Sequence, residues 1–257
     1  MMRPTYVSTR GFARPASFRE VAIGGLASDG GLYVPSHWPS IDPIQLSKFR
    51  NWHFVEIARE ILGLWLGDAV DGIDIAIAAQ RMAKAFDHPD VVPLEQLEDD
   101  LWILELYHGP TLAFKDVAMQ FLARLIEQII ATSGQQLNIL TATSGDTGAA
   151  AVHAFRGCEN VRLFTLFPEG RISDAQRRQM TTVIEPNIFN IAITGTFDDC
   201  QRLVKTLLKE FKASKNYALT TVNSINWARI AAQTIYYFLA CSRLPADHPD
   251  PTFVVST

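Results

Sequence analysis

The segment that decides the fold is LNILTATSGDTGAAAVHAF, which runs from Leu137 to Phe155. Its first residues form a mostly apolar run that is typical of a buried strand, and its last residues are small and apolar, as in a packed helix. Between them lies SGDTG, a turn that is rich in glycine and in residues that cap helices. A strand, a tight turn and a helix in direct succession predict a βα unit of an α/β fold.

The same turn predicts a binding site for an anion. Gly145 and Gly148 are expected to let a ligand approach the backbone closely. Ser144, Asp146 and Thr147 are expected to cap the helix and to leave N–H groups pointing outward. An ordinary capped βα loop without a ligand remains the alternative interpretation of this pattern taken alone.

Strand-like runs and runs with helical periodicity alternate along the second part of the chain. The expected strands are 101–106, 137–141, 161–167 and 188–193, and the expected helices are 114–130, 148–155, 173–180 and 197–211. A long helix over 227–243 then leads to a further expected strand at 252–256. This alternation predicts a mostly parallel sheet that helices flank on both faces, and the sheet is incomplete because the last strand has no crossover after it.

The first part of the chain differs, because it starts with turns and continues with helical patterns. These patterns lie near 44–50, 54–66 and 73–86, and they predict a small α-rich domain. Proline and acidic residues at Asp87–Asp90 and at Val92–Pro93 interrupt the periodicity. We therefore expect an α/β protein with a small α-rich N-terminal domain over residues 1–92 and a second domain over residues 93–257.

A second motif, HGPTLAFKD at residues 108–116, places Lys115 at the start of an expected helix inside an apolar run. Burial and the positive end of the helix dipole both disfavour the charged ammonium, so we expect a reactive amine that can form a Schiff base. A surface lysine at a helix start is the alternative for this motif alone. Ligands of parallel sheets bind beyond the carboxyl ends of the strands, and we expect Lys115 and the SGDTG turn to meet there.

Composition narrows the functional classes. The 257 residues are 48% hydrophobic and carry a net charge of −4 without a block of like charges, which argues against binding to nucleic acid or to a membrane surface. No apolar run reaches the ~18 residues of a membrane span. Cys158, Cys200 and Cys241 are odd in number and widely spaced, which favours a reduced, cytoplasmic compartment. No histidine or cysteine spacing is typical of a metal site.

The two motifs together resemble those of the threonine synthase family, which are pyridoxal-phosphate enzymes of the tryptophan synthase β-subunit fold group, also called fold type II. Three further segments carry the same resemblance, namely YVSTRG at 6–11, GLASDGGLYVP at 25–35 and NSINWAR at 223–229. The resemblance therefore extends over nearly the whole chain. It implies the conversion of O-phospho-L-homoserine and water to L-threonine and phosphate, by a monomer or a homodimer.

The implied reaction needs sites for three anions, namely the cofactor phosphate, the substrate carboxylate and the substrate phosphate, and the sequence supplies about two. This count and the resemblance together assign the candidate site residues. The cofactor is assigned to Lys115 and Phe114, the substrate carboxylate to Thr143, Ser144, Gly145, Asp146, Thr147 and Gly148, and the substrate phosphate to Asn223, Ser224, Asn226 and Arg229. A helix cap followed by a surface arginine is the alternative for the last cluster. His108 could contact a phosphate, although a hydrogen-bonded turn residue is the simpler interpretation. Asp116 could help to hold the amine, although an acidic residue that matches the helix dipole is the simpler interpretation.

In the implied reaction, Lys115 carries the cofactor until the substrate amine displaces it, and the freed amine then moves protons at Cα and Cβ. Phosphate leaves from Cγ, and water later adds at Cβ. Two alternatives stay open, namely a related phospho-lyase that releases an α-keto acid and a non-catalytic binding remnant. The resemblance also places the loop for the cofactor phosphate, and the residue beside the pyridine nitrogen, after Thr257. We therefore expect the front portion of a longer protein, with weak or absent cofactor binding and no activity in the 257 residues alone.

Overall fold

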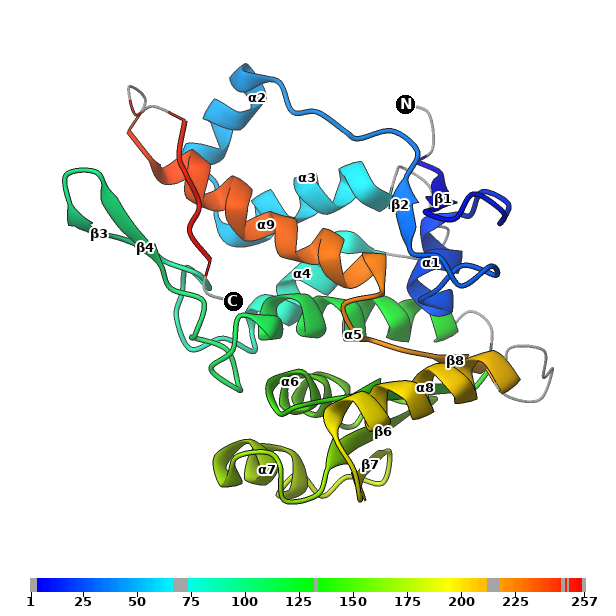
Figure 1. Cartoon of the computed structure of the whole chain (residues 1–257). Helices are drawn as coiled ribbons and strands as arrows, with labels where there is room; N and C mark the ends of the chain where they lie inside the picture. Colours follow the sequence, from blue (N-terminus) through cyan, green and yellow to red (C-terminus); the bar gives the residue numbers. More distant parts are fainter. Residues whose placement is uncertain are drawn as a thin grey trace.

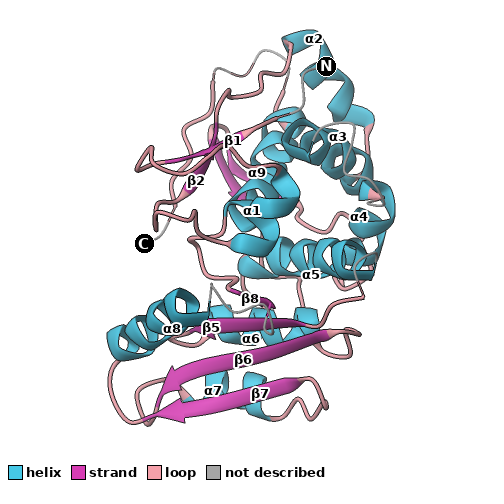
Figure 2. Cartoon of the chain, turned by 90° about the vertical axis from the view of Figure 1, so that its right-hand side faces the viewer, coloured by secondary structure: helices cyan, strands magenta, loops and turns pink. Residues whose placement is uncertain are grey.

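The computed structural model describes residues 4–66, 74–131, 134–211, 218–245, 248 and 250–255. Within these ranges a layer of helices lies above a small sheet that has its own covering helices (Figures 1 and 2). The predicted α/β class is confirmed, and the sheet is parallel throughout. No helix of the described ranges combines the length and the apolar character that crossing a membrane requires.

The sheet has the strand order β7-β6-β5-β8. Its strands are β5 (Leu137–Ala142), β6 (Val161–Pro168), β7 (Ile188–Ile193) and β8 (Ala218–Thr220). Leu137 pairs with Val161 on one side and with Ala218 on the other. Alternate residues of β5 point to opposite faces, so Ile139 packs into the large core below the helical layer, while Leu140 belongs to a second cluster under the opposite helix.

Three helices cover this sheet, and they are α6 (Asp146–Phe155), α7 (Asp174–Thr181) and α8 (Phe197–Phe211). The large core includes Ala149 and Val152 of α6, whereas Cys200 and Val204 of α8 belong to the second cluster. The sheet is therefore flanked on both faces, as the alternation of strands and helices predicts.

The upper layer is built around α5 (Lys115–Ala131), which lies between α6 of the sheet layer and the remaining helices (Figure 1). Those helices are α1 (Phe18–Gly24), α2 (Pro43–Lys48), the short η1 (Phe49–Asn51), α3 (Phe54–Leu66), α4 (Ile75–Ala83) and α9 (Trp227–Arg243). A two-stranded antiparallel sheet of β1 (Tyr6–Ser8) and β2 (Tyr33–Pro35), which come before and after α1 in the chain, adjoins this helix. Because α5 packs on both layers, its apolar residues are buried nearly all round.

Helix α9 crosses the predicted domain boundary in space. It packs against α1, α2 and α3 of the first 92 residues and also against α5. Arg243 at its end donates to the carbonyls of Phe49 (2.8 Å), Arg50 (2.6 Å) and Trp52 (2.5 Å). One hydrophobic core therefore includes residues from both predicted domains.

Two expected strands differ in the structure. Residues 101–106 were expected in the parallel sheet, but β4 (Leu101–Leu104) instead forms a separate antiparallel hairpin with β3 (Leu94–Glu98). The exposed pair Asp99–Asp100 reverses the chain between them, so this strand pairs locally. Residues 252–255 form no strand, and Phe253 instead packs edge-on against Tyr237 of α9, with ring centroids 4.9 Å apart. Residue 256 of that expected strand, like residue 73 of the expected first-domain helix, lies outside the described residues.

Candidate active site

Lys115 is the first residue of α5, and its side chain is 18% exposed. Its Nζ atom donates a hydrogen bond to Oδ2 of Asp146 at 3.1 Å and lies 4.4 Å from the centroid of the Phe114 ring. The structure thus brings the two motifs together, as expected. The expected apolar surroundings are only part of the environment, because the Asp146 carboxylate stabilises a positive charge on the amine.

The loop before Lys115 is held by Asp116, which is fully buried. The backbone N–H and the hydroxyl of Thr111 donate to its two carboxylate oxygens at 2.8 and 2.7 Å. Burial raises the pKa of Asp116 above its usual value, and the hydrogen bonds from Thr111 oppose this shift only in part. A side chain at Gly109 would meet the same carboxylate, with Cβ 2.5 Å from Oδ2. Asp116 therefore shapes the loop, and its oxygens point toward Thr111 rather than holding the Lys115 amine.

The SGDTG turn is capped by a residue that precedes it. Oγ1 of Thr143 accepts the N–H groups of Gly145 (2.9 Å) and Gly148 (2.8 Å). The helix N-cap is Gly145, and it has no side-chain cap, so the expected capping by Ser144, Asp146 and Thr147 is wrong. Thr143 is almost completely buried and points its hydroxyl into the turn, which makes it the natural partner of these two N–H groups.

Both glycines of the turn are required by packing within the chain. Gly145 has φ +140°, and a Cβ there would lie 2.2 Å from Cδ of Gln176. A Cβ at Gly148 would lie 2.5 Å from Sδ of Met180 and from Cγ2 of Thr143. Close approach to a ligand is therefore not needed to explain these two glycines.

Two N–H groups of the turn remain available for an anion. Those of Ser144 and Thr147 have no acceptor in the described part of the chain. Beside them, the carboxylate of Asp146 accepts a hydrogen bond from Nε2 of Gln176 at 2.6 Å as well as the one from Lys115. Partial burial raises the pKa of Asp146, but these hydrogen bonds outweigh it, and the pKa is lower than usual.

The side-chain amides of Asn223 and Asn226 bind other parts of the chain and stabilise the fold. Asn223 donates to the carbonyl of Ala142 at 2.8 Å and accepts its N–H at 3.2 Å, which ties the cluster to the end of β5. Asn226 is fully buried and is the N-cap of α9, where its side chain accepts the N–H of Ala228 at 3.0 Å and donates to Ala22. Ser224 is exposed, and its hydroxyl has no partner among the described residues.

Arg229 is the most unusual residue of this cluster. Its side chain is 4% exposed, and one guanidinium nitrogen donates to the carbonyl of Val222 at 3.1 Å. Nε has no hydrogen-bond partner, and no carboxylate of the described residues lies within ion-pair distance. Burial lowers the pKa of Arg229 to about 10. The surface arginine that was the alternative for this position is therefore wrong, and a buried cation without a counter-charge stands there.

His108 lies on the side of the loop that faces the β3–β4 hairpin. Its Nε2 atom is 2.7 Å from Oε2 of Glu105, and its ring lies 4.9 Å from the ring of His88. No contact joins it to Lys115 within the described ranges, so the structure does not bring it into the group around the amine. No cluster of three potential metal ligands occurs among the described residues.

The contacts between α7 and the candidate site were not predicted from the sequence. Gln176 contacts the SGDTG turn, and Gln179, one turn later, donates to the carbonyl of Thr111 in the lysine loop at 3.2 Å. The only available signal is the spacing of the two glutamines by three residues, which puts them on the same side of a helix. That spacing does not reveal what the helix faces.

The arrangement fits a pyridoxal phosphate and an anionic amino-acid substrate. It offers an amine at the start of α5, two unbonded N–H groups at the start of α6, and a buried guanidinium with an unsatisfied Nε. An aldehyde cofactor needs the amine, and helix N-termini and arginines are the groups that bind carboxylates and phosphates in proteins.

Comparison with known proteins agrees with this fit. Residues 5–81 match the family "Threonine synthase N terminus", and residues 88–257 match the family "Pyridoxal-phosphate dependent enzyme". The threonine synthase of Pseudomonas aeruginosa is 44% identical over 252 residues, which are 98% of this chain and 54% of that protein. That of Corynebacterium glutamicum is 44% identical over 90% of this chain and 50% of its own length.

Solved structures give the same result. The structure of pyridoxal-phosphate-bound threonine synthase from Brucella melitensis superposes with a TM-score of 0.87 at 44% identity, covering 95% of this chain and 53% of that one. Yeast threonine synthase gives 0.83 at 40% identity, covering 93% of this chain and 49% of that one. The chain thus spans about half the length of the relatives it matches. It belongs to the pyridoxal-phosphate-dependent enzyme family, with the N-terminal region of the threonine synthases ahead of that family's domain.

Proposed function

We propose that the chain carries the lysine-bearing part of a threonine synthase, which converts O-phospho-L-homoserine and water to L-threonine and phosphate. The observation that carries this proposal is the 3.1 Å hydrogen bond between Nζ of Lys115 and Asp146. It puts the amine beside the turn whose Ser144 and Thr147 N–H groups are unbonded. An amine beside an anion site suits an amino-acid substrate, because the nitrogen and the carboxylate of such a substrate are attached to the same carbon.

Lys115 would hold pyridoxal phosphate through its amine, with the Phe114 ring next to it. When bound, the cofactor supplies an electron sink for the bonds at the α-carbon of the substrate. In its neutral form the amine of Lys115 would act as the base that takes a proton from Cα and moves one at Cβ. For this the amine must leave Asp146, because an ammonium paired with a carboxylate cannot accept a proton.

Two separate groups would orient the substrate. The N–H groups of Ser144 and Thr147, at the positive end of α6, suit the carboxylate. Arg229 suits the phosphate ester, because a phosphate oxygen would satisfy the unbonded Nε and neutralise the buried charge. The exposed hydroxyl of Ser224 adds a donor nearby in the sequence. Two distinct anion sites would select a substrate that has an anion at each end.

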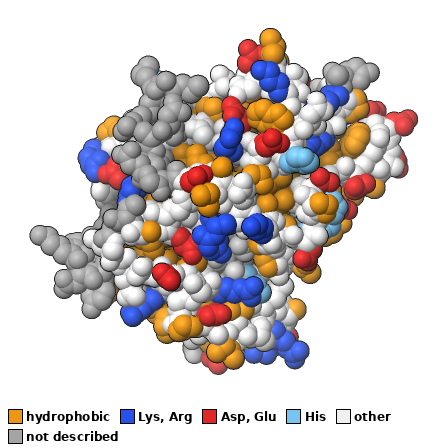
Figure 3. All heavy atoms as spheres, turned by 180° about the vertical axis from the view of Figure 1, so that it is seen from behind, with side chains coloured by type: hydrophobic (Ala, Val, Ile, Leu, Met, Phe, Trp, Pro, Cys, Tyr) orange, Lys and Arg blue, Asp and Glu red, His pale blue; other side chains and the backbone are white. Residues whose placement is uncertain are grey.

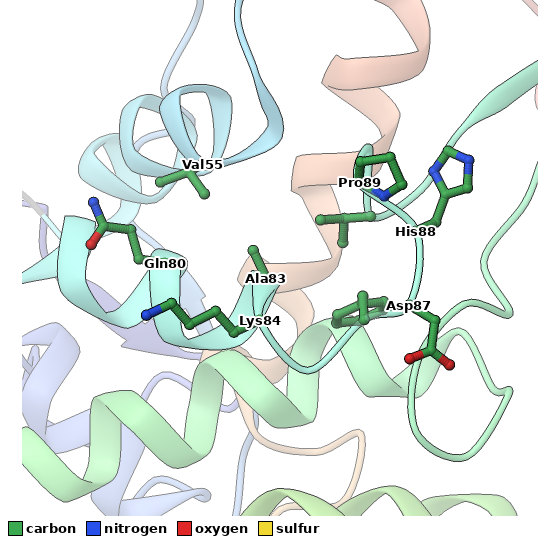
Figure 4. A pocket seen from close by; sticks show the side chains of 9 residues that line it. Val55, Gln80, Ala83, Lys84, Asp87, His88 and Pro89 are labelled. Carbon is green, nitrogen blue, oxygen red and sulfur yellow. The ribbon is translucent and has the colours of Figure 1, made fainter.

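Mapping of the cofactor lysine tests the proposal. Protein incubated with pyridoxal phosphate and reduced with borohydride is expected to carry the pyridoxyl group on the tryptic peptide that contains residue 115. Lys115→Ala should lose this modification. Lys84→Ala is the matched control, since Lys84 is an exposed lysine directly after α4 that lines an open groove of about 540 Å³ (Figure 4), and its loss should leave the modification unchanged. Stoichiometric modification of another lysine in the Lys115→Ala protein would contradict the assignment.

Product analysis tests the reaction itself. With O-phospho-L-homoserine and the whole protein, L-threonine and phosphate should appear in equal amounts. Phosphate with an α-keto acid in place of threonine would assign the protein to the phospho-lyases instead.

We further propose a cytoplasmic enzyme that acts as a monomer or a homodimer on small molecules and does not bind nucleic acid. Cys158 and Cys200 are buried and free, and free cysteines without disulfides are usual in a reducing compartment. Acidic and basic side chains are interspersed on the face seen in Figure 3, and such a mixture favours neither a nucleic acid nor an anionic membrane. Sedimentation of the whole protein would distinguish monomer from dimer.

A further inference from the structure

Helix α7 contacts both motifs of the candidate site. Gln176 donates to Oδ1 of Asp146 in the SGDTG turn at 2.6 Å, and Gln179 donates to the carbonyl of Thr111 in the lysine loop at 3.2 Å. Neither glutamine has a role in the proposed chemistry. Their shared position raises the question of what this helix contributes to the site.

The two oxygens of Asp146 have different partners. Oδ1 accepts the amide of Gln176, while Oδ2 accepts the amine of Lys115 at 3.1 Å. The Asp146 side chain is 47% exposed, so without the amide it would be free to rotate toward solvent. The hydrogen bond from Gln176 therefore fixes the rotamer in which Oδ2 faces the lysine.

The amide of Gln176 is itself oriented. The hydroxyl of Ser173, the N-cap of α7, donates to Oε1 of Gln176 at 3.0 Å, so Nε2 is turned toward Asp146. The Gln176 side chain also fills the space beside Gly145, where any Cβ would collide with it. A row of four groups, Ser173, Gln176, Asp146 and Lys115, thus runs from the start of α7 to the start of α5.

We infer that Gln176 is a positioning residue that holds Asp146 on the amine of Lys115 and thereby keeps this amine paired and in place before the cofactor binds. The inference rests on the proposed function of Lys115. The other titratable groups near the row face elsewhere, because Asp116 binds Thr111 and His153 of α6 lies against the carbonyl of Gln179. Asp146 is thus the acidic group that meets the lysine.

The reactivity of Lys115 tests this role in the chain without cofactor. Trinitrobenzenesulfonate reacts with neutral amines, and the rate at residue 115 can be followed by peptide mass spectrometry at one fixed pH. Asp146→Asn should raise the rate up to about fivefold, the size expected for loss of a partly exposed ion pair. Gln176→Met keeps the bulk but lacks the amide, and it should raise the rate about twofold. The double variant should react no faster than Asp146→Asn alone, because both changes act through one contact.

Gln179→Met is the matched control, since it removes the same amide from the same face of α7 and leaves Asp146 untouched. Its rate should equal that of the unchanged protein. Equal rates for Gln176→Met and the unchanged protein, equal increases for both glutamine variants, or additive effects in the double variant would each overturn the inference. Circular dichroism verifies folding, and Ser173→Ala, expected to give a smaller rise in the same direction, replaces Gln176→Met if that variant does not fold.

The labelling experiment and the cofactor mapping have separate outcomes. A protein that takes the pyridoxyl group on Lys115 but shows the same labelling rate in all variants would overturn the role of Gln176 and leave the proposed function intact. A protein that shows the predicted labelling pattern but takes no cofactor at Lys115 would overturn the proposed function instead.

Discussion

Lys115 and Arg229, the two cations assigned to the candidate site, differ in whether a counter-charge accompanies them. Lys115 is 18% exposed and pairs with the carboxylate of Asp146. Arg229 is 4% exposed, has one hydrogen bond to the carbonyl of Val222, and meets no carboxylate among the described residues. One end of the site thus supplies its own counter-charge, whereas the other leaves a buried charge without one.

This difference predicts which of the two cations a bound ligand would stabilise. A paired, partly exposed cation contributes little to stability either way, and it must leave its partner before it can react. A buried cation without a counter-charge costs folding free energy, and a bound anion would offset that cost. Under the proposed roles, Arg229 would therefore gain more from a bound anion than Lys115 would.

The largest predicted effect compares two arginines of α9. Arg243 donates to three backbone carbonyls around η1, whereas Arg229 donates to one. Arg243→Met should lower the free energy of unfolding by about 3 kcal/mol, because three carbonyls lose a charged donor. Arg229→Met should leave it unchanged or raise it by about 1 kcal/mol, because the buried charge is removed. Urea unfolding measures both, and similar losses in the two variants would remove the contrast between an arginine with three hydrogen bonds and one with a single hydrogen bond.

A smaller effect on stability is expected for Thr143, which caps the SGDTG turn beside Lys115. Thr143→Val leaves the N–H groups of Gly145 and Gly148 without their acceptor in a buried position. We expect a loss of about 2 kcal/mol in the free energy of unfolding. Thr143→Ser keeps the hydroxyl and is the control, with a loss well below that of the valine variant. A valine variant as stable as the unchanged protein would mean that water or a rearranged turn satisfies these N–H groups.

A third prediction adds the ligand to the Arg229 end. Inorganic phosphate should raise the free energy of unfolding by about 1.4 kcal/mol when its concentration is tenfold above its Kd. The Arg229→Met variant should show no such rise, while Arg243→Met should show the full rise from its lower starting point. Titration of the melting temperature with phosphate, with sodium chloride at matched ionic strength as the reference, measures this. An equal rise in both variants would place the anion elsewhere.

Much of the fold follows from local patterns. The apolar runs that became β5, β6 and β7 are continuous because both faces of a parallel sheet are covered, and the helices between them have clear periodicity. Residues 101–104 show a similar apolar pattern, but their partner is decided by the turn at Asp99–Asp100 rather than by the run itself. The three residues of β8 are too few to give a pattern of their own.

The candidate site was predictable in position but not in its contacts. The motifs fix where Lys115 and the SGDTG turn stand in the sequence, and the βα order places the SGDTG turn at the carboxyl end of β5. Lys115 reaches the same place by the packing of α5 on α6, because the strand before α5 is not part of the parallel sheet. The hydrogen bond from Gln176 to Asp146 depends on how α7 packs against the turn, about 30 residues away in the chain. The cap by Thr143 depends on the backbone geometry of the turn itself. The burial of Arg229 depends on α9 lying against the first domain, which no pattern around residue 229 reveals.

The smallest predicted effect is the pH dependence of the stability that Asp146, the partner of Lys115, contributes. Partial burial raises the pKa of Asp146, but the hydrogen bonds from Gln176 and Lys115 bring it below its usual value. Stability from this carboxylate is therefore present above the unfolded value near pH ~4 and is lost as the pH falls through the lower folded value. Asp146→Asn should cost less than about 1 kcal/mol at neutral pH, because the pair is partly exposed.

Buried Asp116 gives the opposite sign, because its pKa is raised in the folded protein. Its carboxylate favours folding most in the protonated form, so stability falls as the pH rises from the usual aspartate value through the raised one. Urea unfolding across the acid range should therefore show that the difference between the unchanged protein and Asp146→Asn shrinks toward low pH. A difference that instead grows toward low pH would mean that the carboxylate beside Lys115 is as poorly solvated as Asp116. The charged carboxylate of Asp146 would then oppose folding, as that of Asp116 does. The contrast between Lys115, which has a favourable counter-charge, and Arg229, which has none, would no longer hold.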